Sequence, residues 1–335
     1  MADSLRARGA AVEFVGSANG IEARLVPQCG YKLHALPLAG LAGGPAERAR
    51  AGALFLKAIA RCRNILKTFR PGAVLGVGGY ASAPAVVAAK LLKIPTFLHE
   101  QNSVPGRANR FASRYTCEVL VTFPAAVDLL KGAVHVGMPT RGEFFGASRE
   151  EGLARLELEP PVVLLFGGSG GALKLNLAAE EAFGGGETPY SVYQISGRRD
   201  FERLSTENPR HRIVAYDDEL WHALAASEVV VTRSGAGSLF DTAAVGRAAL
   251  LVPYPYATAD HQLHNARYFT DKGAAELMLD LEVTASSLRG RVESLLRDRS
   301  RRETLAKNMR TLATPESAGE VAGQLLTAAA AKGAA

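Results

Sequence analysis

The sequence predicts an α/β protein in which helices cover parallel sheets. Short apolar runs alternate with longer amphipathic stretches along most of the chain, which is the pattern of repeated β-α-β units. The alternation occurs in both halves of the 335 residues, a length that is natural for two domains. We therefore expect two α/β domains with a ligand-binding cleft between them, at the carboxyl ends of the strands.

The first domain is expected to span residues 1–138. Its apolar runs are short, whereas its longest amphipathic segment has the periodicity of a helix. The expected strands are 11–16, 71–80 (ending in a glycine turn), 94–100 and 117–123, and the expected helices are 51–70 and 81–93.

The second domain is expected to span residues 139–315. It repeats the same order of strand, turn and helix, and its last part is rich in charged residues. A strand, a glycine turn and a helix are expected over 160–180, further strands at 190–197, 211–216, 228–235 and 248–255, and helices at 286–310 and 316–331.

The composition limits the kinds of partner. A formal net charge of +6 and a pI near 9.3 favour an anionic partner, such as a phosphorylated substrate or a membrane surface. No nucleic acid is expected, because no block of like charges and no nucleic-acid-binding motif is visible. The three cysteines lack metal spacing, and we expect no metal and no cofactor. Without an apolar run long enough to span a bilayer and without a signal peptide, any membrane contact is expected to be peripheral.

Two glycine turns occupy equivalent places in the two halves. "GVGGYASAP" (76–84) and "FGGSGGALKLN" (166–176) each follow an apolar strand and open a helix. Glycine lets the backbone approach a ligand closely, and a helix N-terminus offers free N–H groups to phosphate. Tight turns need glycine in any case, but the matching positions favour phosphate or diphosphate. Neither turn is a P-loop or the glycine pattern of a nicotinamide-dinucleotide fold.

A third strand-to-helix turn, "VTRSGAGSLFDTAA" (231–244), places Asp241 one to two turns into the following helix. A carboxylate there can accept hydrogen bonds from two ribose hydroxyls, although an aspartate near a helix N-terminus is also stabilised by the helix dipole alone. The loop "PYPYATADHQLHNA" (253–266) adds amides and imidazoles, which suit the hydroxyls of a sugar. Metal ligation by its histidines is less favoured, because no HExxH motif and no nearby cysteine accompany them.

The stretch "FLHEQNSVPGRANR" (97–110) concentrates polar groups at the end of an apparent buried strand. His99 and Glu100 are adjacent there, and amides and two arginines follow within one turn. We expect His99 and Glu100 to face a ligand, either as a proton acceptor or as positioning groups. A polar strand end that simply packs is the alternative.

These motifs together resemble the MurG family, the membrane-associated glycosyltransferases of peptidoglycan synthesis. The resemblance covers nearly the whole chain and implies a GT-B fold of two Rossmann-like domains. It implies inverting transfer of N-acetylglucosamine from UDP-N-acetylglucosamine to undecaprenyl-diphospho-N-acetylmuramoyl-pentapeptide. The segments that carry it are "GGYASAPAVVAAKLLKIPTFLHEQNSVPGRANR", "VGMPTR", "FGGSGGALKLN", "YDDE", "TRSGAGSLFD" and "ADHQ".

The resemblance also implies roles for single residues. The second domain would bind the UDP-sugar and the first the undecaprenyl-linked acceptor, and the helix at 316–331 would pack back on the first domain. Within the donor set, Asp217 would lie near the uracil, 236–241 near the ribose and diphosphate, and His261 and Gln262 near the sugar. The implied sites are catalytic His99 and Glu100; donor-binding Asn102, Arg141, Ser169, Gly170, Asp217, Ala236, Gly237, Ser238, Leu239, Phe240, Asp241, His261 and Gln262; and acceptor-binding Gly79, Tyr80, Ser82 and Asn109.

The family resemblance further implies a peripheral protein on the cytoplasmic face of the plasma membrane. The helix at 51–70 and the segment 90–93 interleave basic and apolar residues, which suits a surface of acidic lipid. The same interleaving is normal for a helix that covers a sheet.

The sequence departs from the family pattern at its start. "MADSLRARGAAVEFVG" begins inside a helix, so the family's first strand and first glycine loop, with its histidine, are missing. We therefore expect little transferase activity from this chain. Smaller departures are Asp241 where glutamate is usual, Met138 where asparagine is common and His261 where glutamine also occurs. The alternatives are a non-catalytic UDP-sugar-binding relative and a GT-B epimerase of UDP-N-acetylglucosamine.

Overall fold

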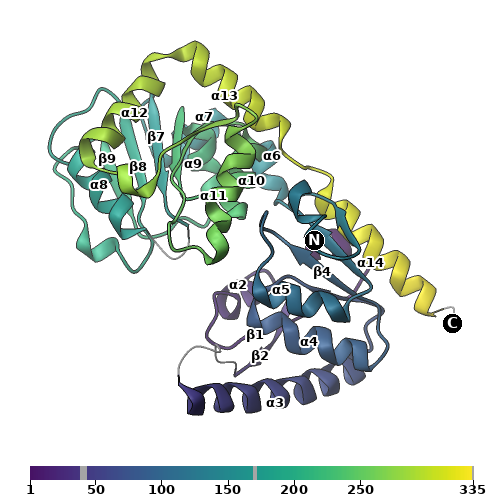
Figure 1. Cartoon of the computed structure of the whole chain (residues 1–335). Coiled ribbons are helices and arrows are strands. Elements are labelled where there is room, and N and C mark those ends of the chain that lie inside the picture. Colours follow the sequence, from purple (N-terminus) through teal and green to yellow (C-terminus); the bar gives the residue numbers. More distant parts are fainter. Residues whose placement is uncertain (38–43, 169–171, 334–335) are drawn as a thin grey trace. The chain divides into compact units, whose positions relative to one another are not determined.

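The protein is seen in a computed structural model that describes residues 1–37, 44–168 and 172–333. It divides into two compact units, Met1–Pro139 with Glu316–Ala335, and Thr140–Pro315. All strand pairs of both units are parallel, and helices cover the sheets (Figure 1). The predicted α/β class with parallel sheets is confirmed.

The first unit contains two parallel sheets. All five residues of β4 are buried, because both of its faces are covered. Phe97 packs into a cluster on one face, and Leu98 packs into a different cluster on the other. The two-stranded sheet pairs β1 (Glu13–Ser17) with β2 (Lys32–Leu36), and the four-stranded sheet has the order β3 (Val74–Gly76), β4 (Thr96–Glu100), β5 (Glu118–Val121), β6 (Ala133–His135).

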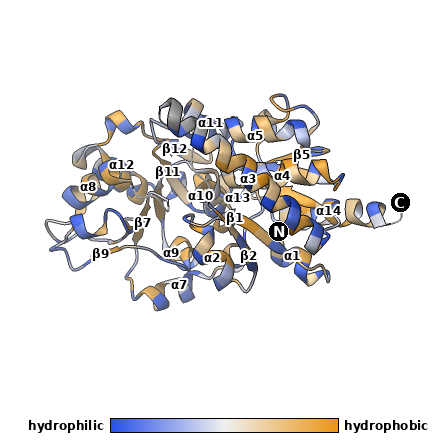
Figure 2. Cartoon of the chain, turned by 90° about the horizontal axis from the view of Figure 1, so that it is seen from below, coloured by the Kyte–Doolittle hydropathy of each residue, from blue (hydrophilic) through white to orange (hydrophobic). Residues whose placement is uncertain are grey.

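Helices pack against both faces of the four-stranded sheet. On one side, Val86 of α4 joins the cluster of Leu98. Next to α4, residues of α3 share a core with α4 and with Leu36 of β2, and Figure 2 shows hydrophobic and hydrophilic residues alternating along α3. On the other side, Val321 and Leu325 of the last helix join the cluster of Phe97. The helices are α1 (Ala2–Ala7), α2 (Glu22–Gln28), α3 (Pro45–Phe69), α4 (Gly79–Leu91), α5 (Arg107–Ala112) and α14 (Ser317–Gly333), with 3₁₀ turns η1 (Ser113–Tyr115) and η2 (Pro124–Ala126).

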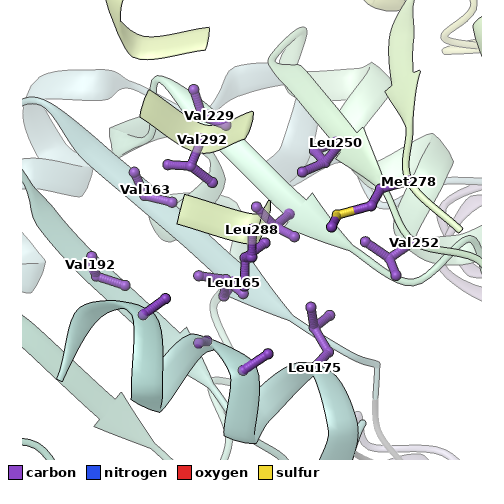
Figure 3. Close-up of a cluster of buried hydrophobic side chains, with 14 of the residues drawn as sticks. Val163, Leu165, Leu175, Val192, Val229, Leu250, Val252, Met278, Leu288 and Val292 are labelled. Carbon is purple, nitrogen blue, oxygen red and sulfur yellow. The ribbon is translucent and has the colours of Figure 1, made fainter. Parts of the chain in front are cut away.

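The second unit has one six-stranded sheet in the order β12-β11-β10-β7-β8-β9. Alternate residues of a central strand, Val163 and Leu165, join one cluster with Leu288 and Val292 of α12 (Figure 3). The strands are β7 (Val162–Phe166), β8 (Ser191–Ile195), β9 (His211–Val214), β10 (Val229–Thr232), β11 (Ala248–Leu251) and β12 (Ala275–Leu277). The helices are α6 (Gly142–Gly146), α7 (Arg149–Leu156), α8 (Leu173–Phe183), α9 (Leu220–Ala226), α10 (Ala236–Val245), α11 (His261–Thr270), α12 (Ala285–Arg297) and α13 (Arg299–Thr311), with 3₁₀ turns η3 (Phe201–Arg203), η4 (Thr258–Asp260) and η5 (Asp280–Glu282).

The segment 286–310, which was expected to be helical, forms two helices. Asp298 ends α12 and begins α13, and its carboxylate accepts a hydrogen bond from the Arg301 amide at 2.9 Å. A side-chain acceptor at the N-cap satisfies an amide that has no partner within the helix, which favours a new start at this point.

Parallel strands place their carboxyl ends at one edge of a sheet. In the first unit, the glycine turn of 77–79 and the segment from Gln101 follow β3 and β4. In the second unit, the turns after β7, β10 and β11 lie at the ends of neighbouring strands. None of the helices within the described ranges is both long enough and apolar enough to cross a membrane.

Candidate active site

Glu100 organises the polar segment that follows β4. Its carboxylate is 1% exposed and accepts four hydrogen bonds. Oε1 accepts from the Asn102 backbone amide at 2.9 Å and side-chain amide at 3.2 Å, and Oε2 accepts from the Gly106 amide at 3.1 Å and Asn109 Nδ2 at 2.8 Å. A buried carboxylate is stable when its lone pairs are filled in this way. Glu100 therefore stabilises the backbone conformation of residues 101–109.

His99 is fully buried next to Glu100. Its Nε2 lies 3.2 Å from the Gly137 carbonyl oxygen, and its Nδ1 lies 3.2 Å from Nε2 of Gln101. Burial lowers the pKa of His99 to about 4, and the hydrogen bond to Gly137 opposes that shift only in part. His99 is neutral at physiological pH, and its ring nitrogens have partners. The geometry of His99 and Glu100 favours positioning over the predicted catalytic roles.

The turn before α4 lies against Asn109. Gly78 has a φ of 93°, and a Cβ there would come within 3.3 Å of the Asn109 side chain. Asn109 is 4% exposed, and its Oδ1 is buried without a hydrogen-bond partner among the described residues. Gly79 also has a positive φ, of 73°, and, apart from its chain neighbours, no described atom lies within 4 Å of the place where a Cβ would be. Ser82 Oγ donates to the Gly79 carbonyl at 3.1 Å. The predicted acceptor residues thus meet at the N-terminus of α4, except for the side chain of Tyr80, which lies outside the described part.

The turn between β10 and α10 is held by side chains of α11. Oε1 of Gln262 accepts from the Ser234 amide at 3.1 Å and from the Tyr254 amide at 2.9 Å, and Nδ2 of Asn265 donates to the Ser234 carbonyl at 3.1 Å. Gly235 is the N-cap of α10. The first amides of a helix have no partner within the helix, so α10 presents an anion-binding N-terminus on a braced turn.

Asp241 lies in the second turn of α10 and is partly buried. Among the described residues, no hydrogen-bond donor contacts its carboxylate. Burial raises the pKa of Asp241 to about 7, and the positive charge of Arg141 opposes this rise. Arg141 itself is exposed and lies over the rings of Phe144 and Trp221, with its Cζ 5.1 and 4.9 Å from their centres. The guanidinium of Arg141 therefore acts electrostatically on the carboxylate of Asp241, which has no hydrogen-bond donor among the described residues.

Only some residues of the predicted donor-binding stretch Ala236–Asp241 have groups that a ligand could contact. Leu239 and Phe240 are 0% and 2% exposed, and their side chains belong to the core. The Leu239 amide already donates to the Gly235 carbonyl at 3.1 Å. Including these two residues among the ligand contacts is therefore not supported. The amides of the first turn and the carboxylate of Asp241 are the groups that a ligand could use.

The loop before α11 has an unusual backbone. Ala259 and Asp260 have φ values of 52° and 49°, a left-handed conformation that costs about 1–2 kcal/mol per non-glycine residue. His261 follows and is partly exposed, and its Nδ1 lies 2.9 Å from the Thr258 carbonyl oxygen. Its Nε2 is the ring nitrogen left for a ligand.

Asp217 lies after β9, in the turn before α9. Tyr193 Oη donates to its Oδ2 at 3.1 Å, and the Glu219 amide donates to its Oδ1 at 2.8 Å. Burial raises the pKa of Asp217, and the Tyr193 hydrogen bond opposes the rise. Asp217 braces this turn, so a ligand there would meet backbone groups of the turn.

The predicted contacts Ser169 and Gly170 lie outside the described residues. The helix that follows them, α8, is anchored by buried amides. Nδ2 of Asn176 donates to the Ser196 carbonyl at 2.8 Å and to Asp200 Oδ2 at 3.1 Å, and Nε2 of Gln194 donates to Asn176 Oδ1 at 3.3 Å. Such a buried, hydrogen-bonded network fixes the position of α8.

Sequence reasoning missed three charged residues near these turns: Lys174, Arg233 and Asp280. Arg233 was visible in "TRSG" as a charge at the end of an apolar strand, and such a charge needs a partner. Asp280 could not be identified from the sequence, because the residues that it pairs with are distant in the chain. Within the described ranges, no group of three or more metal-ligating side chains occurs.

The family models match most of the chain. Residues 1–121 match the N-terminal domain of glycosyltransferase family 28, and residues 162–321 match the C-terminal domain of that family. The transferase of Rubrobacter xylanophilus named UDP-N-acetylglucosamine–N-acetylmuramyl-(pentapeptide) pyrophosphoryl-undecaprenol N-acetylglucosamine transferase is 66% identical over 331 residues, which are 98% of each chain. The protein of the same name from Lactiplantibacillus plantarum is 33% identical over 95% of this chain and 92% of its own.

A solved structure agrees with these matches. The MurG protein of Acinetobacter baumannii superposes with a TM-score of 0.74 at 27% identity, over 97% of this chain and 94% of that one. A UDP-GlcNAc 2-epimerase from Neisseria meningitidis has a TM-score of 0.60 at 10% identity, over 93% and 90% of the two chains, which is a likeness of fold alone. The chain has the two-domain GT-B fold and belongs to the MurG family of glycosyltransferases, within glycosyltransferase family 28.

Proposed function

We propose that the chain transfers N-acetylglucosamine from UDP-N-acetylglucosamine to undecaprenyl-diphospho-N-acetylmuramoyl-pentapeptide. The observation that carries this proposal is the 66% identity to the transferase of Rubrobacter xylanophilus over 98% of both chains. The likeness to a 2-epimerase lies at 10% identity and gives no comparable support to the epimerase alternative.

The donor residues of the proposal lie mainly in the second unit. The carboxylate of Asp241 accepts the ribose hydroxyls, and the free amides of Ala236, Gly237 and Ser238 meet the diphosphate. Arg141 adds a positive charge there, since its charge already acts on Asp241. Support for this arrangement comes from the braced turn before α10 and from the lack of a donor on Asp241 among the described residues.

The remaining donor contacts are part of the same proposal. The turn at Asp217 meets the uracil, while Nε2 of His261 and the amide NH₂ of Gln262 meet the sugar hydroxyls. Oε1 of Gln262 is not available, because it holds two backbone amides. Ser169, Gly170 and Asn102 are the other residues of the proposed donor set.

The acceptor residues of the proposal are Gly79, Tyr80, Ser82 and Asn109, at the N-terminus of α4. The open space around Gly79 and the unpaired Oδ1 of Asn109 support this placement. We assign His99 and Glu100 to the positioning of this region, since burial and four hydrogen bonds occupy them.

The reaction is a displacement at the anomeric carbon with inversion. The acceptor hydroxyl oxygen forms a bond to that carbon, the bond to the donor phosphate oxygen breaks, and UDP leaves with the electron pair. The hydroxyl proton passes to a base. The helix N-terminus and Arg141 stabilise the charge on the departing diphosphate, an effect of roughly 2–4 kcal/mol for each well-placed donor.

A transfer assay tests the proposal directly. From the start of the sequence we expected little transfer, but the 66% identity to the Rubrobacter xylanophilus transferase over 98% of both chains favours activity. We therefore expect the folded chain to move radiolabelled N-acetylglucosamine from UDP-N-acetylglucosamine onto the lipid-linked acceptor. We also expect it to bind UDP-N-acetylglucosamine more tightly than UDP-glucose or TDP-glucose. Binding without transfer would support the non-catalytic relative instead. Formation of an epimerised UDP-sugar in the absence of acceptor would support the epimerase.

We also propose that helices α3, α4 and α5 of the first unit form the membrane-binding face. Leu56, Leu91 and Phe111 are 69%, 64% and 37% exposed, although they are large and apolar. Phe111 lies against Phe55 of α3, with ring centres 6.5 Å apart, so α5 and α3 share this surface. Figure 1 shows the three helices lying together in the first unit. Exposed cations lie on these helices or within two residues of their ends: Lys57, Arg61, Lys90, Lys93, Arg107, Arg110 and Arg114.

Vesicle co-sedimentation tests this face. We expect binding to vesicles with acidic lipid at low salt, and on the order of 100-fold weaker binding when Lys57, Lys90 and Lys93 are all changed to glutamine, at about 1 kcal/mol per cation near the surface. Leu56→Gln with Leu91→Gln should also weaken binding. Leu129→Gln is the control, because Leu129 is 46% exposed but lies outside these helices. Binding that is independent of lipid charge and salt would contradict the electrostatic part.

A further inference from the structure

Asp280 forms ion pairs with cations from two different turns of the second unit. Its Oδ1 lies 2.6 Å from Nη1 of Arg233, the first residue after β10, and its Oδ2 lies 3.3 Å from Nζ of Lys174 in the first turn of α8. The Lys174 ammonium also donates to the backbone carbonyl of Asp280. The Arg233 and Asp280 side chains are only 6% and 15% exposed, whereas Lys174 is 47% exposed. The Arg233 pair is therefore the more strongly desolvated of the two.

Arg233 extends this contact to a third strand end. Its Nη1 donates to the carbonyls of Val252 and Pro253, each at 3.2 Å, and its guanidinium carbon lies 5.7 Å from the centre of the Tyr254 ring. Val252 and Pro253 follow β11 directly and open the loop that leads to His261. The carboxylate of Asp280 therefore joins the segments that follow β7, β10 and β11, three adjacent strands of the sheet.

We propose that Asp280 is a positioning residue for donor binding: it holds Arg233 and Lys174 so that the start of α8 and the turns after β10 and β11 keep the arrangement that receives the UDP-sugar. The proposal rests on the donor site proposed above. Asp280 itself follows β12 and is not one of the residues assigned to contact the ligand.

The physical reason is the burial of the Arg233 guanidinium. A buried cation needs a counter-charge, and removing that charge leaves the cation uncompensated. Nε of Arg233 has no hydrogen-bond partner, and the carbonyls of Val252 and Pro253 are neutral, so Asp280 supplies the only counter-charge to Arg233 among the described residues. Without Asp280 we expect Arg233 to turn toward water, which withdraws its hydrogen bonds from Val252 and Pro253. The loop of 253–260 then loses the hydrogen bonds that hold its start, while the core of the unit stays intact.

Glu276, on β12 and four residues before Asp280, provides a matched control. Its side chain is 9% exposed and pairs with Arg291 at 3.3 Å and Arg301 at 2.8 Å, which belong to α12 and α13. Glu276→Gln therefore also removes a buried carboxylate that holds two cations, but those cations lie on helices outside the proposed donor turns. Asp280→Glu keeps the charge and tests whether the conservative variant restores function.

The experiment compares the full chain with Asp280→Asn, Asp280→Glu and Glu276→Gln. Calorimetry measures UDP-N-acetylglucosamine affinity, transfer kinetics give KM and kcat, and hydrogen exchange of the ligand-free proteins follows residues 232–238 and 253–262. For Asp280→Asn we expect affinity on the order of 10-fold weaker, a matching rise in the donor KM with the acceptor KM unchanged, and faster exchange at 253–262. Asp280→Glu should recover part of the loss. Glu276→Gln should keep the affinity and the slow exchange at 253–262.

Two results would overturn the proposal. Unchanged affinity and exchange in Asp280→Asn would show that Arg233 and Lys174 need no anchor. Equal losses in Asp280→Asn and Glu276→Gln would show general destabilisation rather than positioning. Absence of UDP-N-acetylglucosamine binding by the unsubstituted chain is a separate outcome that refutes the donor site, and the role of Asp280 with it.

Discussion

Glu100→Gln is expected to destabilise the first unit by about 3 kcal/mol and to abolish most of the transferase activity. The carboxylate of Glu100 accepts four hydrogen bonds while it is 1% exposed. Glutamine keeps the volume but turns one acceptor oxygen into an NH₂ group that faces other donors. At least one donor then stays buried without a partner, which costs about 1–3 kcal/mol, and the stronger bonds to a charged acceptor are lost as well.

Chemical denaturation measures the loss in the free energy of unfolding, and hydrogen exchange identifies where it arises. We expect the amides of 101–109 to exchange faster, because Asn102, Gly106 and Asn109 lose their common acceptor. Glu118→Gln is the matched control, since Glu118 lies on the neighbouring strand β5 and is only partly buried. A Glu100→Gln protein with unchanged stability and activity would contradict the organising role.

The fold was predictable where the apolar periodicity is strong. The central strand β7 is a continuous apolar run, and β4 has an apolar centre at Phe97 and Leu98; both strands are fully buried, and both were expected. The strand β2 was not expected, because "KLHAL" mixes polar and apolar residues on an edge of a two-stranded sheet. The strands β6 and β12 have three residues each, which is too short for a periodic signal.

The candidate site was predictable where its functional groups lie close together in the sequence. Glycine turns and the carboxylate of Asp241 could be recognised because strand, turn and helix follow one another in the chain. The burial of a single side chain could not be predicted from the local sequence. His99 was expected to face a ligand but is fully buried. The ion pair of Arg233 with Asp280 joins residues far apart in the sequence, so only the folded sheet brings them together.

Asp241 links donor binding to pH. Burial raises its pKa to about 7, so the folded protein holds a proton there that the unfolded chain, with an ordinary aspartate, has lost above about pH 4. Between these two values the folded state binds more protons than the unfolded state. The free energy of unfolding should therefore fall as the pH rises from about 4 to 7. Conversely, ribose hydroxyls donate to the ionised carboxylate, so donor binding should favour deprotonation.

The predicted result is a pair of opposite trends in the unsubstituted chain between pH 5.5 and 8. The affinity for UDP-N-acetylglucosamine should rise with pH and level off above about 7, while stability declines by on the order of 2 kcal/mol. UDP-N-acetylglucosamine is the suitable probe, because its diphosphate is esterified at both ends and does not titrate in this range. Calorimetry measures the first trend, and denaturant unfolding at each pH measures the second.

Asp241→Asn should remove both trends, because the amide cannot ionise. Its affinity should be weaker by roughly 1–3 kcal/mol, since an amide replaces the acceptor of the ribose hydroxyls. It should also be more stable than the unsubstituted chain above pH 7, where the buried charge is lost. Asp271→Asn is the control, because Asp271 is an exposed aspartate at the end of α11. If Asp241→Asn and the unsubstituted chain show the same pH dependence, the carboxylate of Asp241 neither titrates in this range nor receives the ribose.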